Sequence, residues 1–522
     1  MNQEEIKKKQ KRVMVYVMII SLICVVGVSY AFFTAGMSSE TSTTVRADAG
    51  TMKITYDGGK KINLVGIYPK DDVWATKTIT VTGNNTTDAE MYYKLTLVVD
   101  SNTFKIDDPL QYELVSTNTS TNGEIIPNIS KTDITGTSIE LGSGHFVKAN
   151  NAKHTYLLKI YYPKKATSQN ANQGAAFSAH VEITSAKAPT VINLVKAIRA
   201  NNEVKAPITT PGAAVSTASE ALLASTEDDY GTSYYFRGAV TNNYVEFANK
   251  CWRIVRVGGD GSVKLILHND NTTGVANPCD AANNNASAAF ARYSGTTYKS
   301  AFNTNYNDNA YVGFKFGTVG SSTYEATHAN TNNSTILTNL EAWYNNNDNF
   351  KKYEKVIADT VWCNDKTNVT DTTYNPWNMS NVNGLGYGTN TTYYGATQRL
   401  VSKSNSAGGT GPSLKCNGEL SKIASKVGLI TADELAYAGY AWNIGNTTTY
   451  LQENATDTYW WSLSPGIFVG SSAGVWRVGG SNGGLNRSDV DYTGGLRPSI
   501  SLKSTTSVTG EGTSSSPYII SM

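Results

Sequence analysis

The sequence predicts an N-terminal transmembrane or signal helix, then an all-β sandwich, then an α+β domain. Three observations predict this order: an uncharged apolar stretch near the N-terminus, alternating apolar and polar residues from about 50 to 185, and strand patterns on both sides of two helical patterns after residue 233. A chain of 522 residues has room for several domains. We therefore expect four segments, with a linker as the third: 1–33, 34–188, 189–232 and 233–522.

The N-terminal segment predicts export. The 21 residues from Val13 to Phe33 carry no charge, which is enough to cross a hydrocarbon core of roughly 30 Å as a helix. Four lysines and Arg12 precede it, and such positive flanks stay in the cytoplasm. Ser29-Tyr30-Ala31 is also a small-x-small pattern that a signal peptidase could cut. The rest of the chain is expected on the extracellular face of the cytoplasmic membrane, or secreted if the leader is cleaved.

The composition argues against nucleic-acid binding. The net charge is +2, but the first 33 residues hold five Lys or Arg and two Glu, so the remainder carries −1. Proteins that bind nucleic acid concentrate positive charge on the bound face. Hydrophobic residues make up 40% of the chain, which is enough for real cores, whereas charged residues make up only 16%. A weakly charged, polar surface of this kind suits an exported β-rich protein.

The second segment reads as strands of an antiparallel sandwich. Apolar and polar residues alternate in several runs, and turn clusters such as Asp57-Gly58-Gly59 and Gly83-Asn84-Asn85 divide them. The expected strands are Thr51–Tyr56, Lys77–Val81, Tyr93–Val99, His154–Tyr162 and Ala176–Thr184. The third segment is expected to be a linker with one short helix, Thr190–Asn201, which could be a spacer or could dock on a domain.

The last segment predicts an α+β domain whose two ends pair. One helix is expected over about Thr338–Thr360, and a second begins at Thr431, where Glu434 completes a capping-box pattern. Strand patterns lie on both sides of these helices, which favours pairing between the ends of the domain. The expected strands are Tyr244–Phe247, Cys251–Val257, Val263–Leu267, Ser499–Leu502 and Pro517–Ile520.

Four cysteines fall in this last segment, and a fifth, Cys24, lies in the apolar stretch. Four cysteines allow three pairings, and an oxidising location favours disulfides. We expect the two sequence-local pairs, Cys251–Cys279 and Cys363–Cys416. A zinc site is the alternative, but no CxxC or nearby His spacing supports it.

The most distinctive stretch, Tyr459–Leu502, predicts a binding surface. Glycines interrupt its short strands, and aromatic and Arg residues on such loops supply rigid contact area and adaptable hydrogen bonds. The tryptophans have an alternative role, which is to fill the core. The candidate ligand-binding residues are Trp460, Trp461, Ser472, Trp476, Arg477, Asn486, Arg487, Asp489, Asp491 and Tyr492.

Signals of catalysis are weak, so we expect no enzyme, no cofactor and no metal. The five histidines are scattered, and no HExxH, P-loop or helix-opening GxGxxG occurs. Gly470–Gly474 matches GxSxG, but a nucleophile elbow needs a helix after it and a later His, and none follows His328. Asp433 and Glu434 form a carboxylate pair whose place in a first helical turn favours the helix dipole instead.

The last segment also resembles a large family of exported proteins of gut Firmicutes. The motifs that carry the resemblance are Tyr234–Gly238, Cys251–Val257, Gly428–Glu434, Trp461–Pro465 and Gly495–Pro498. Its C-terminal part is similar to the C-type-lectin-like fold shared by formylglycine-generating enzymes and the variable proteins of diversity-generating retroelements. The resemblance implies that 468–492 could be diversified to bind different ligands. Calcium-dependent sugar binding would need an EPN or QPD triplet, and neither occurs.

The N-terminal part has its own resemblance. Ser29–Thr34, followed by strands, resembles the TasA/camelysin family of exported β-sandwich proteins, which includes subunits of matrix fibres. In that family the leader is removed after the matching alanine, here Ala31, which would leave the mature chain without an anchor.

Together these patterns predict a bacterial cell-surface protein of the adhesin or receptor type. Its expected partner is an extracellular protein or a glycan, bound through the C-terminal loops, with a membrane contact only if the N-terminal helix is retained. The alternative is a structural subunit of an extracellular matrix or pilus-like fibre.

Overall fold

The computed structural model describes residues 43–48, 51–85, 90–118, 122–185, 191–270, 275 and 277–521. It is mostly β-sheet, with 41% strand and 13% helix. The chain divides into two compact units, residues 1–189 and 190–522, which are described separately below. The apolar stretch 13–33 lies outside the described residues. Among the helices that are described, none is both long and apolar enough to span a membrane.

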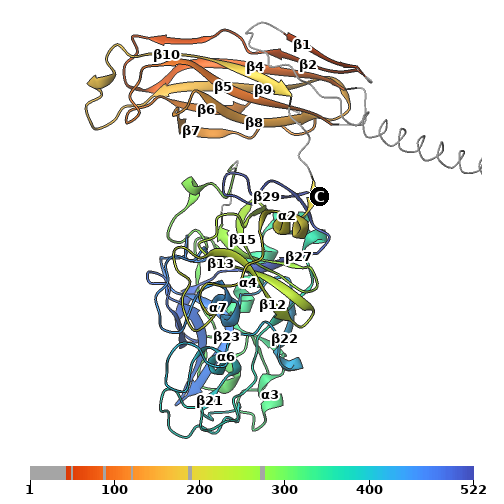
Figure 1. The fold of residues 1–522 in the computed structure, drawn as a ribbon, viewed down its shortest axis with the longest axis vertical. Helices are drawn as coiled ribbons and strands as arrows, with labels where there is room; N and C mark the ends of the chain where they lie inside the picture. The colour runs from red at the N-terminus through yellow and green to blue at the C-terminus, as the bar shows by residue number, and fades with distance from the viewer. Residues whose placement is uncertain are drawn as a thin grey trace, which may run out of the picture. The chain divides into compact units, whose positions relative to one another are not determined.

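The first unit is a sandwich of two antiparallel sheets (Figure 1). The six-stranded sheet has the order β1 (Thr43–Asp48), β2 (Thr51–Asp57), β4 (Lys70–Asn85), β9 (Ala149–Tyr162), β6 (Gln111–Ser116) and β7 (Ile129–Asp133). The four-stranded sheet has the order β3 (Ile62–Val65), β10 (Ala176–Ser185), β5 (Met91–Asn102) and β8 (Ser138–Phe146).

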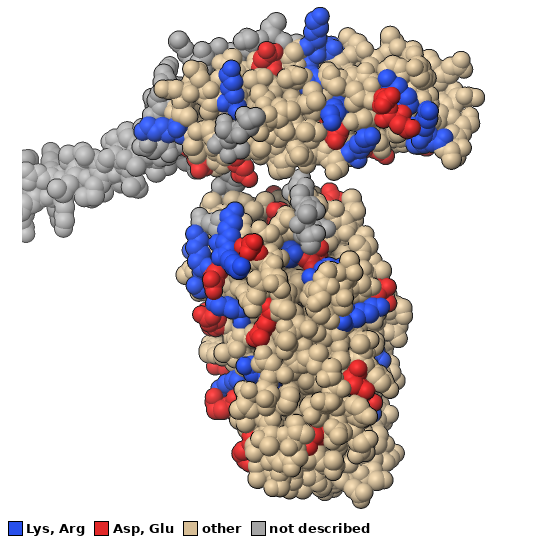
Figure 2. Space-filling model, turned by 180° about the vertical axis from the view of Figure 1, so that it is seen from behind, with Lys and Arg blue, Asp and Glu red and all other residues tan. Residues whose placement is uncertain are grey.

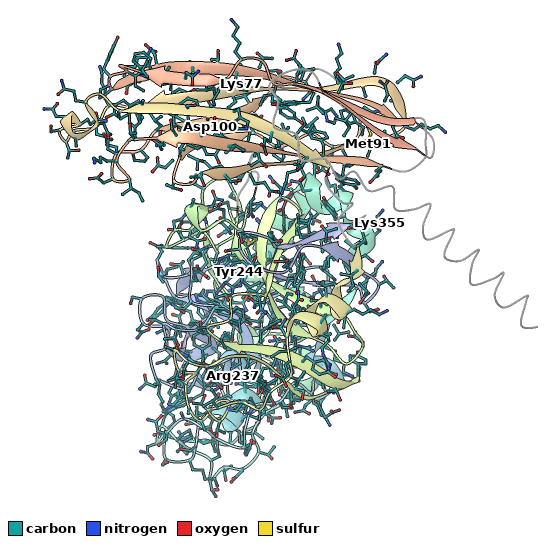
Figure 3. The ribbon with its side chains drawn as sticks, turned by 45° about the horizontal axis from the view of Figure 1, so that its top comes forward. Lys77, Met91, Asp100, Arg237, Tyr244 and Lys355 are labelled. Carbon is teal, nitrogen blue, oxygen red and sulfur yellow. A yellow bond between two sulfur atoms is a disulfide. The ribbon has the colours of Figure 1, made fainter. Side chains whose placement is uncertain are left out.

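One hydrophobic core joins these two sheets. Strand β5 begins at Met91, which Figure 3 labels. Its alternate side chains from Met91 onward are buried, because a strand points successive side chains to opposite faces. Leu95 and Leu97 of this strand share the core with Ile79 and Val81 of β4 in the other sheet. All five expected strands of the sandwich are confirmed, each within β2, β4, β5, β9 or β10.

The second unit is built on two larger sheets and several short helices (Figure 1). The nine-stranded sheet has the path β11 (Ile192–Asn193), β28 (Ser507–Thr509), β29 (Tyr518–Ser521), β14 (Tyr244–Phe247), β15 (Lys250–Val257), β13 (Gly231–Gly238) and β12 (Ala221–Asp228), with β16 (Val263–Asn269) between β15 and β27 (Ser499–Leu502). The six-stranded sheet has the path β17 (Lys299–Ala301), β26 (Thr493–Gly495), β23 (Trp460–Val469), β24 (Ser472–Val478) and β25 (Leu485–Asp489), with β21 (Thr392–Tyr393) beside β23.

Two small sheets and six α-helices complete the described part of this unit. The sheets pair β18 (Lys315–Phe316) with β19 (Asn332–Asn333), and β20 (Thr360–Cys363) with β22 (Lys422–Ser425). The helices are α2 (Leu194–Asn201), α3 (Tyr324–His328), α4 (Thr335–Asn345), α5 (Asp348–Lys352), α6 (Gly395–Leu400) and α7 (Ala432–Ala438).

The expected pairing between the ends of this unit is confirmed. In parallel register, Val245 of β14 lies beside Tyr518 of β29, and Glu246 beside Ile519. Both expected disulfides are present as well, Cys251–Cys279 and Cys363–Cys416.

The expected linker over 189–232 is wrong, because its described residues belong to the second unit. The Asn193 side chain caps α2, whose residues Leu194 and Ile198 are buried in the core of the unit. Strand β12 and the start of β13 also fall within the supposed linker and form an antiparallel pair. The small-residue composition of this stretch concealed strands that lie in a sheet.

The side chain of Arg237, labelled in Figure 3, forms hydrogen bonds with the non-strand residues that precede β12. Its fully buried guanidinium donates to Glu220 Oε1 over 3.0 Å and to the backbone oxygen of Thr209 over 3.1 Å. It also donates to the carbonyl oxygens of Ala436 and Tyr437 at the end of α7. A buried charge is tolerated when it is paired and hydrogen-bonded in this way.

The expected helix over 338–360 is too long. Helix α4 begins at Thr335, where the Ser334 side chain accepts a hydrogen bond from Leu337, and it ends before Asn346. Asn347 then caps the separate short helix α5. Asparagine side chains compete for backbone hydrogen bonds, which explains why the asparagine run from 345 to 347 ends the first helix. The helix that begins after Thr431 is confirmed, with both hydrogen bonds of its capping box.

Candidate ligand-binding groove

The Gly-rich closing stretch forms three neighbouring antiparallel strands. Strand β23 turns into β24 at Gly470, whose φ of +64° is easy for glycine and strained for most other residues. Strand β24 then pairs with β25, so that Trp476 lies opposite Arg487 and Arg477 opposite Asn486. Trp476 and Arg487 therefore share one face of the sheet, and Arg477 and Asn486 share the other.

The prediction that Trp460, Trp461 and Trp476 bind a ligand is wrong, because all three are fully buried. The Trp461 indole N–H donates to the backbone oxygen of Ser300 over 2.9 Å, and the Trp460 ring lies beneath the Arg497 guanidinium. These side chains fill the core, which was the alternative role that the sequence left open. A side chain with no exposed surface cannot contact a ligand.

Four of the predicted residues do come together, at an open groove of about 400 Å³. We call it the ligand groove. Its walls are strand β25, the residue Tyr492 that follows it, and three loop segments from elsewhere in the chain. It is lined by Trp377, Asn405, Trp442, Asn443, Asn486, Arg487, Ser488, Asp489 and Tyr492.

Local backbone pairing brings one of these loops to the strand. Trp442 forms a parallel bridge with Leu485, and the backbone N–H of Asn443 donates to the Leu485 oxygen over 2.8 Å. The Asn486 side chain reaches the Asn443 side-chain oxygen at 3.3 Å. The loop around residue 443 thus continues the groove wall beyond the edge of β25.

One acceptor positions the two tryptophans of the groove. The indole N–H groups of Trp377 and Trp442 both donate to Oδ1 of Asn405, over 2.9 and 3.0 Å. Their rings lie 5.4 Å apart, and the Trp442 ring also meets the buried Trp476 edge-on at 5.3 Å. The aromatic wall is therefore supported by the core beneath it.

Several polar side chains of the groove have no hydrogen-bond partner among the described residues. No hydrogen bond or ion pair joins another described side chain to the Arg487 guanidinium, the Asp489 carboxylate or the Tyr492 hydroxyl. The Arg487 guanidinium lies over the Trp377 ring at 4.8 Å. Burial lowers the pKa of Arg487, and the negative charge of Asp489 opposes that effect. The groove thus presents unused donors and acceptors beside aromatic rings.

Three predicted residues, Ser472, Arg477 and Asp491, are half-buried and lie outside the groove lining. Ser472 begins β24 at the turn. Arg477 Nε donates to the Ser488 hydroxyl over 2.8 Å, and its guanidinium lies over the Tyr459 ring. Arg477 is therefore engaged on the opposite face of the sheet from Arg487.

The groove also contains residues that sequence reasoning missed: Trp377, Asn405, Trp442, Asn443 and Ser488. The one local signal is backbone geometry, because Asn405 and Asn443 have φ values of +59° and +55°, a region that asparagine tolerates better than most residues. Their approach to β25 depends on tertiary contacts across tens of residues of chain, which no local pattern encodes.

The carboxylates Asp433 and Glu434 belong to a separate network of ion pairs. Glu434 accepts from Lys264 over 2.6 Å and from Arg256 over 2.8 Å, and Arg399 contacts both Asp433 and Asp365 over 2.7 Å. Burial alone would raise the pKa of Glu434, but the two cations bring it to about 2. Within the described ranges, no three His, Cys, Asp or Glu side chains are grouped to hold a metal ion.

Charge of both signs is mixed over the face shown in Figure 2, where blue and red side chains lie close together on each unit.

No protein-family model matches the chain, and no curated protein matches it.

Proposed function

We propose that this chain is a bacterial cell-surface ligand-binding protein of the adhesin or receptor type, and that it holds its ligand in the ligand groove. The observation that carries the proposal is the convergence of Asn486, Arg487, Asp489 and Tyr492 with Trp377 and Trp442 on one open groove. Small-ligand sites are concave, carry aromatic walls and contain a few well-placed polar groups.

An extracellular location fits the cysteines. Both disulfides of the second unit are compatible with an oxidising compartment, where such bonds persist. We propose that the segment 13–33 directs the chain across the membrane, and that it anchors the protein or is removed after Ala31.

We also propose a C-type-lectin-like fold for the second unit, as the sequence resemblance implies. Pairing of β14 with β29 near the two ends of the unit supports it, as does the position of the groove on the closing strands. Five of the nine residues that line the groove lie within 468–492, the stretch that the resemblance marks for diversification. The carboxylates Asp433 and Glu434 are engaged in ion pairs, which favours binding over catalysis.

The experiment is an adhesion assay with single substitutions in the groove. Full-length chain, purified in mild detergent and coupled to beads, is applied to immobilised mucin, bacterial envelopes and extracellular-matrix preparations. Tyr492→Ala and Arg487→Ala are each expected to reduce bead retention by at least about tenfold, because hot-spot truncations cost 2 kcal/mol or more. Unchanged retention in both variants would overturn the proposal.

Two controls separate loss of binding from loss of folding. Tyr230 is also an exposed tyrosine of the second unit, at 65% against 57% for Tyr492, and it is not among the groove residues. Tyr230→Ala is therefore expected to retain adhesion. The melting temperatures of Tyr492→Ala and Tyr230→Ala are expected to lie within about 2 °C of the parent, because exposed substitutions change stability by about 0.5 kcal/mol or less. Arg487 is half-buried over the Trp377 ring, so Arg487→Ala is expected to cost about 0.5–1 kcal/mol while the chain remains folded.

A further inference from the structure

The lining of the ligand groove has an unusual composition for a binding site. Of its nine residues, three are aromatic, three are asparagines and the others are Arg487, Ser488 and Asp489. None of the described residues that line it has an aliphatic side chain. Most pockets for apolar ligands are lined mainly by hydrophobic residues, with only a few polar groups. The groove therefore suits a ligand whose surface is hydroxylated and also has small apolar faces.

The groove contains both hydrogen-bond donors and acceptors that no described residue uses. The side-chain Nδ2 atoms of Asn405 and Asn443 donate to no described residue, whereas their Oδ1 atoms accept from the indoles and from Asn486. Arg487 offers further donors, and the Asp489 carboxylate offers only acceptors. A sugar hydroxyl both donates and accepts, so neighbouring hydroxyls on one ring match a carboxylate next to an amide or guanidinium.

The aromatic groups supply the complementary apolar contact. Tyr492 exposes 57% of its surface, and Trp377 is half-buried. Trp442 is only 7% exposed and supports the wall from behind, and both indoles are fixed through Asn405. Tyrosine and tryptophan combine a rigid apolar face with a polar tip. The C–H face of a pyranose ring stacks on such a surface while its hydroxyls remain at the rim.

Size and charge narrow the choice of ligand. The groove has a volume of about 400 Å³, which is within the range of pockets that hold a small ligand. A stable protein–protein interface, by contrast, buries about 800 Å² of surface on each partner and needs a broad face. Among the described residues, the lining contains one cation, Arg487, and one anion, Asp489, so its formal charge is zero. A polyanion or a phosphate would find no excess positive charge here.

We propose that the ligand groove binds a short neutral oligosaccharide, with a sugar ring stacked on Tyr492 and its hydroxyls held by Asp489, Arg487 and the groove asparagines. This inference rests on the proposed function and names the ligand class of the same site. No calcium ion is needed, because protein side chains supply the donors and acceptors directly.

The experiment begins with an array of defined neutral and acidic oligosaccharides. Full-length chain in mild detergent is applied to the array, and the strongest neutral hit is then titrated by calorimetry in EDTA. We expect binding to survive EDTA and to change less than about twofold between 50 and 500 mM NaCl, because salt screens charge–charge attraction and the ligand has no charge. Binding only to acidic glycans, with a steep loss in salt, would overturn the inference.

Matched variants then test the two kinds of contact. Tyr492→Phe retains the ring and is expected to bind the hit within about threefold of the parent, whereas Tyr492→Ala is expected to lose at least about tenfold. Asp489→Asn keeps the shape, replaces one acceptor by a donor and is expected to lose about tenfold. Tyr230→Ala serves as the control and is expected to bind as the parent does. Equal affinity for the hit in parent, Tyr492→Ala and Asp489→Asn would overturn the inference.

Competition separates this inference from the proposed function. If the soluble oligosaccharide displaces the beads of the adhesion assay, the glycan inference is supported. If groove variants abolish adhesion but no oligosaccharide competes, the ligand is a protein, and the glycan inference fails while the proposed function stands. If adhesion does not depend on the groove at all, the proposed function fails too.

Discussion

The indole rings of Trp377 and Trp442 lie 5.4 Å apart, and each donates its N–H to the same oxygen of a third residue, Asn405. This shared acceptor fixes two rings from distant parts of the chain in one wall. The relationship makes Asn405 a positioning residue for the groove.

Replacement of Asn405 by glycine tests that role. Its φ of +59° suits glycine, so Asn405→Gly removes the acceptor without introducing backbone strain. We expect the two freed indoles to lower stability by about 1–2 kcal/mol and to shift tryptophan fluorescence to longer wavelength. Asn443→Gly is the matched control, because it has a similar φ of +55° but contacts neither indole N–H. A fluorescence spectrum unchanged in Asn405→Gly would contradict the prediction.

The buried pair Arg237–Glu220 is expected to stabilise the second unit strongly. Neither side chain has exposed surface. Burial raises the pKa of Glu220, but the hydrogen bonds from Thr209 and Ile208 and the charge of Arg237 together lower it below its usual value. Glu220→Gln leaves an uncompensated guanidinium in the core and should cost about 3–5 kcal/mol, measured by urea unfolding. Glu227→Gln, at an exposed position of β12, should change stability by about 0.5 kcal/mol or less. A similar small change in Glu220→Gln would refute the prediction.

His328 is expected to make the second unit sensitive to acid. Burial, with a contribution from the Lys366 charge, lowers the pKa of His328 from 6.5 to about 3. The unfolded state therefore binds more protons between these pH values, so stability is complete above about pH 6.5 and falls as the pH drops toward 3. His328→Gln retains a donor for the Gly386 oxygen and should show a shallower loss of melting temperature between pH 6.5 and 4.

His180 in the first unit supplies a contrast of opposite sign. Burial alone would lower its pKa, but Asp100 and Glu182 raise it above the usual value. The stability it contributes is complete below about pH 6.5 and is lost as the pH rises through the raised value. His180→Gln should therefore leave unchanged the loss of melting temperature that the second unit shows between pH 6.5 and 4. If the parent and His328→Gln lose the same melting temperature between pH 6.5 and 4, the assignment to His328 is contradicted.

The two disulfides should differ in their resistance to reductant. Cys251 and Cys279 are buried, whereas Cys363 and Cys416 are half-buried. Under increasing dithiothreitol, iodoacetamide labelling read by mass spectrometry should detect Cys363 and Cys416 first. The double substitution Cys363→Ser with Cys416→Ser should lower stability by about 2–4 kcal/mol, because this bond closes a loop of 53 residues. Labelling of the buried pair first would contradict the prediction.

If 468–492 is diversified, the variation should fall on the side chains that line the ligand groove and should spare the fully buried ones. Sequences from the same locus in related strains should differ at Asn486, Arg487, Asp489 and Tyr492, and should retain Trp476, because truncating a buried tryptophan costs about 3–5 kcal/mol. A nearby reverse transcriptase with a template repeat that matches these codons is the genomic measurement. Variation spread evenly over buried and exposed positions would contradict it.

Much of the fold could be predicted from local sequence patterns. The strands of the sandwich alternate cleanly because each has one face in the core, and the capping box at Thr431 combines two local hydrogen bonds. The disulfide pairs followed from sequence proximity. The supposed linker was misjudged because β12 is held in place by its partner β13 and by the buried Arg237, rather than by any strong periodicity of its own.

Only part of the groove could be predicted from the sequence. The half-buried polar residues of β25 stand out on a Gly-rich stretch, but Trp476 in the neighbouring strand looks equally suited to binding and is buried. Burial depends on which segments cover a strand, and here the covering segment contains Trp442. Trp377 and Asn405 reach the groove through one hydrogen bond between loops, and a contact of that kind leaves no periodic trace in the sequence.

The parallel pairing of β14 with β29 joins residues more than 270 positions apart, which affects the timing of folding. A ribosome delivers the chain from its N-terminal end, so the large sheet of the second unit cannot close until residues 518–521 have emerged. Until then β14 presents an unpaired edge, and such edges bind other chains. Chaperones that shield this edge during synthesis should matter more for this unit than for the sandwich, whose described strands are all complete by residue 185.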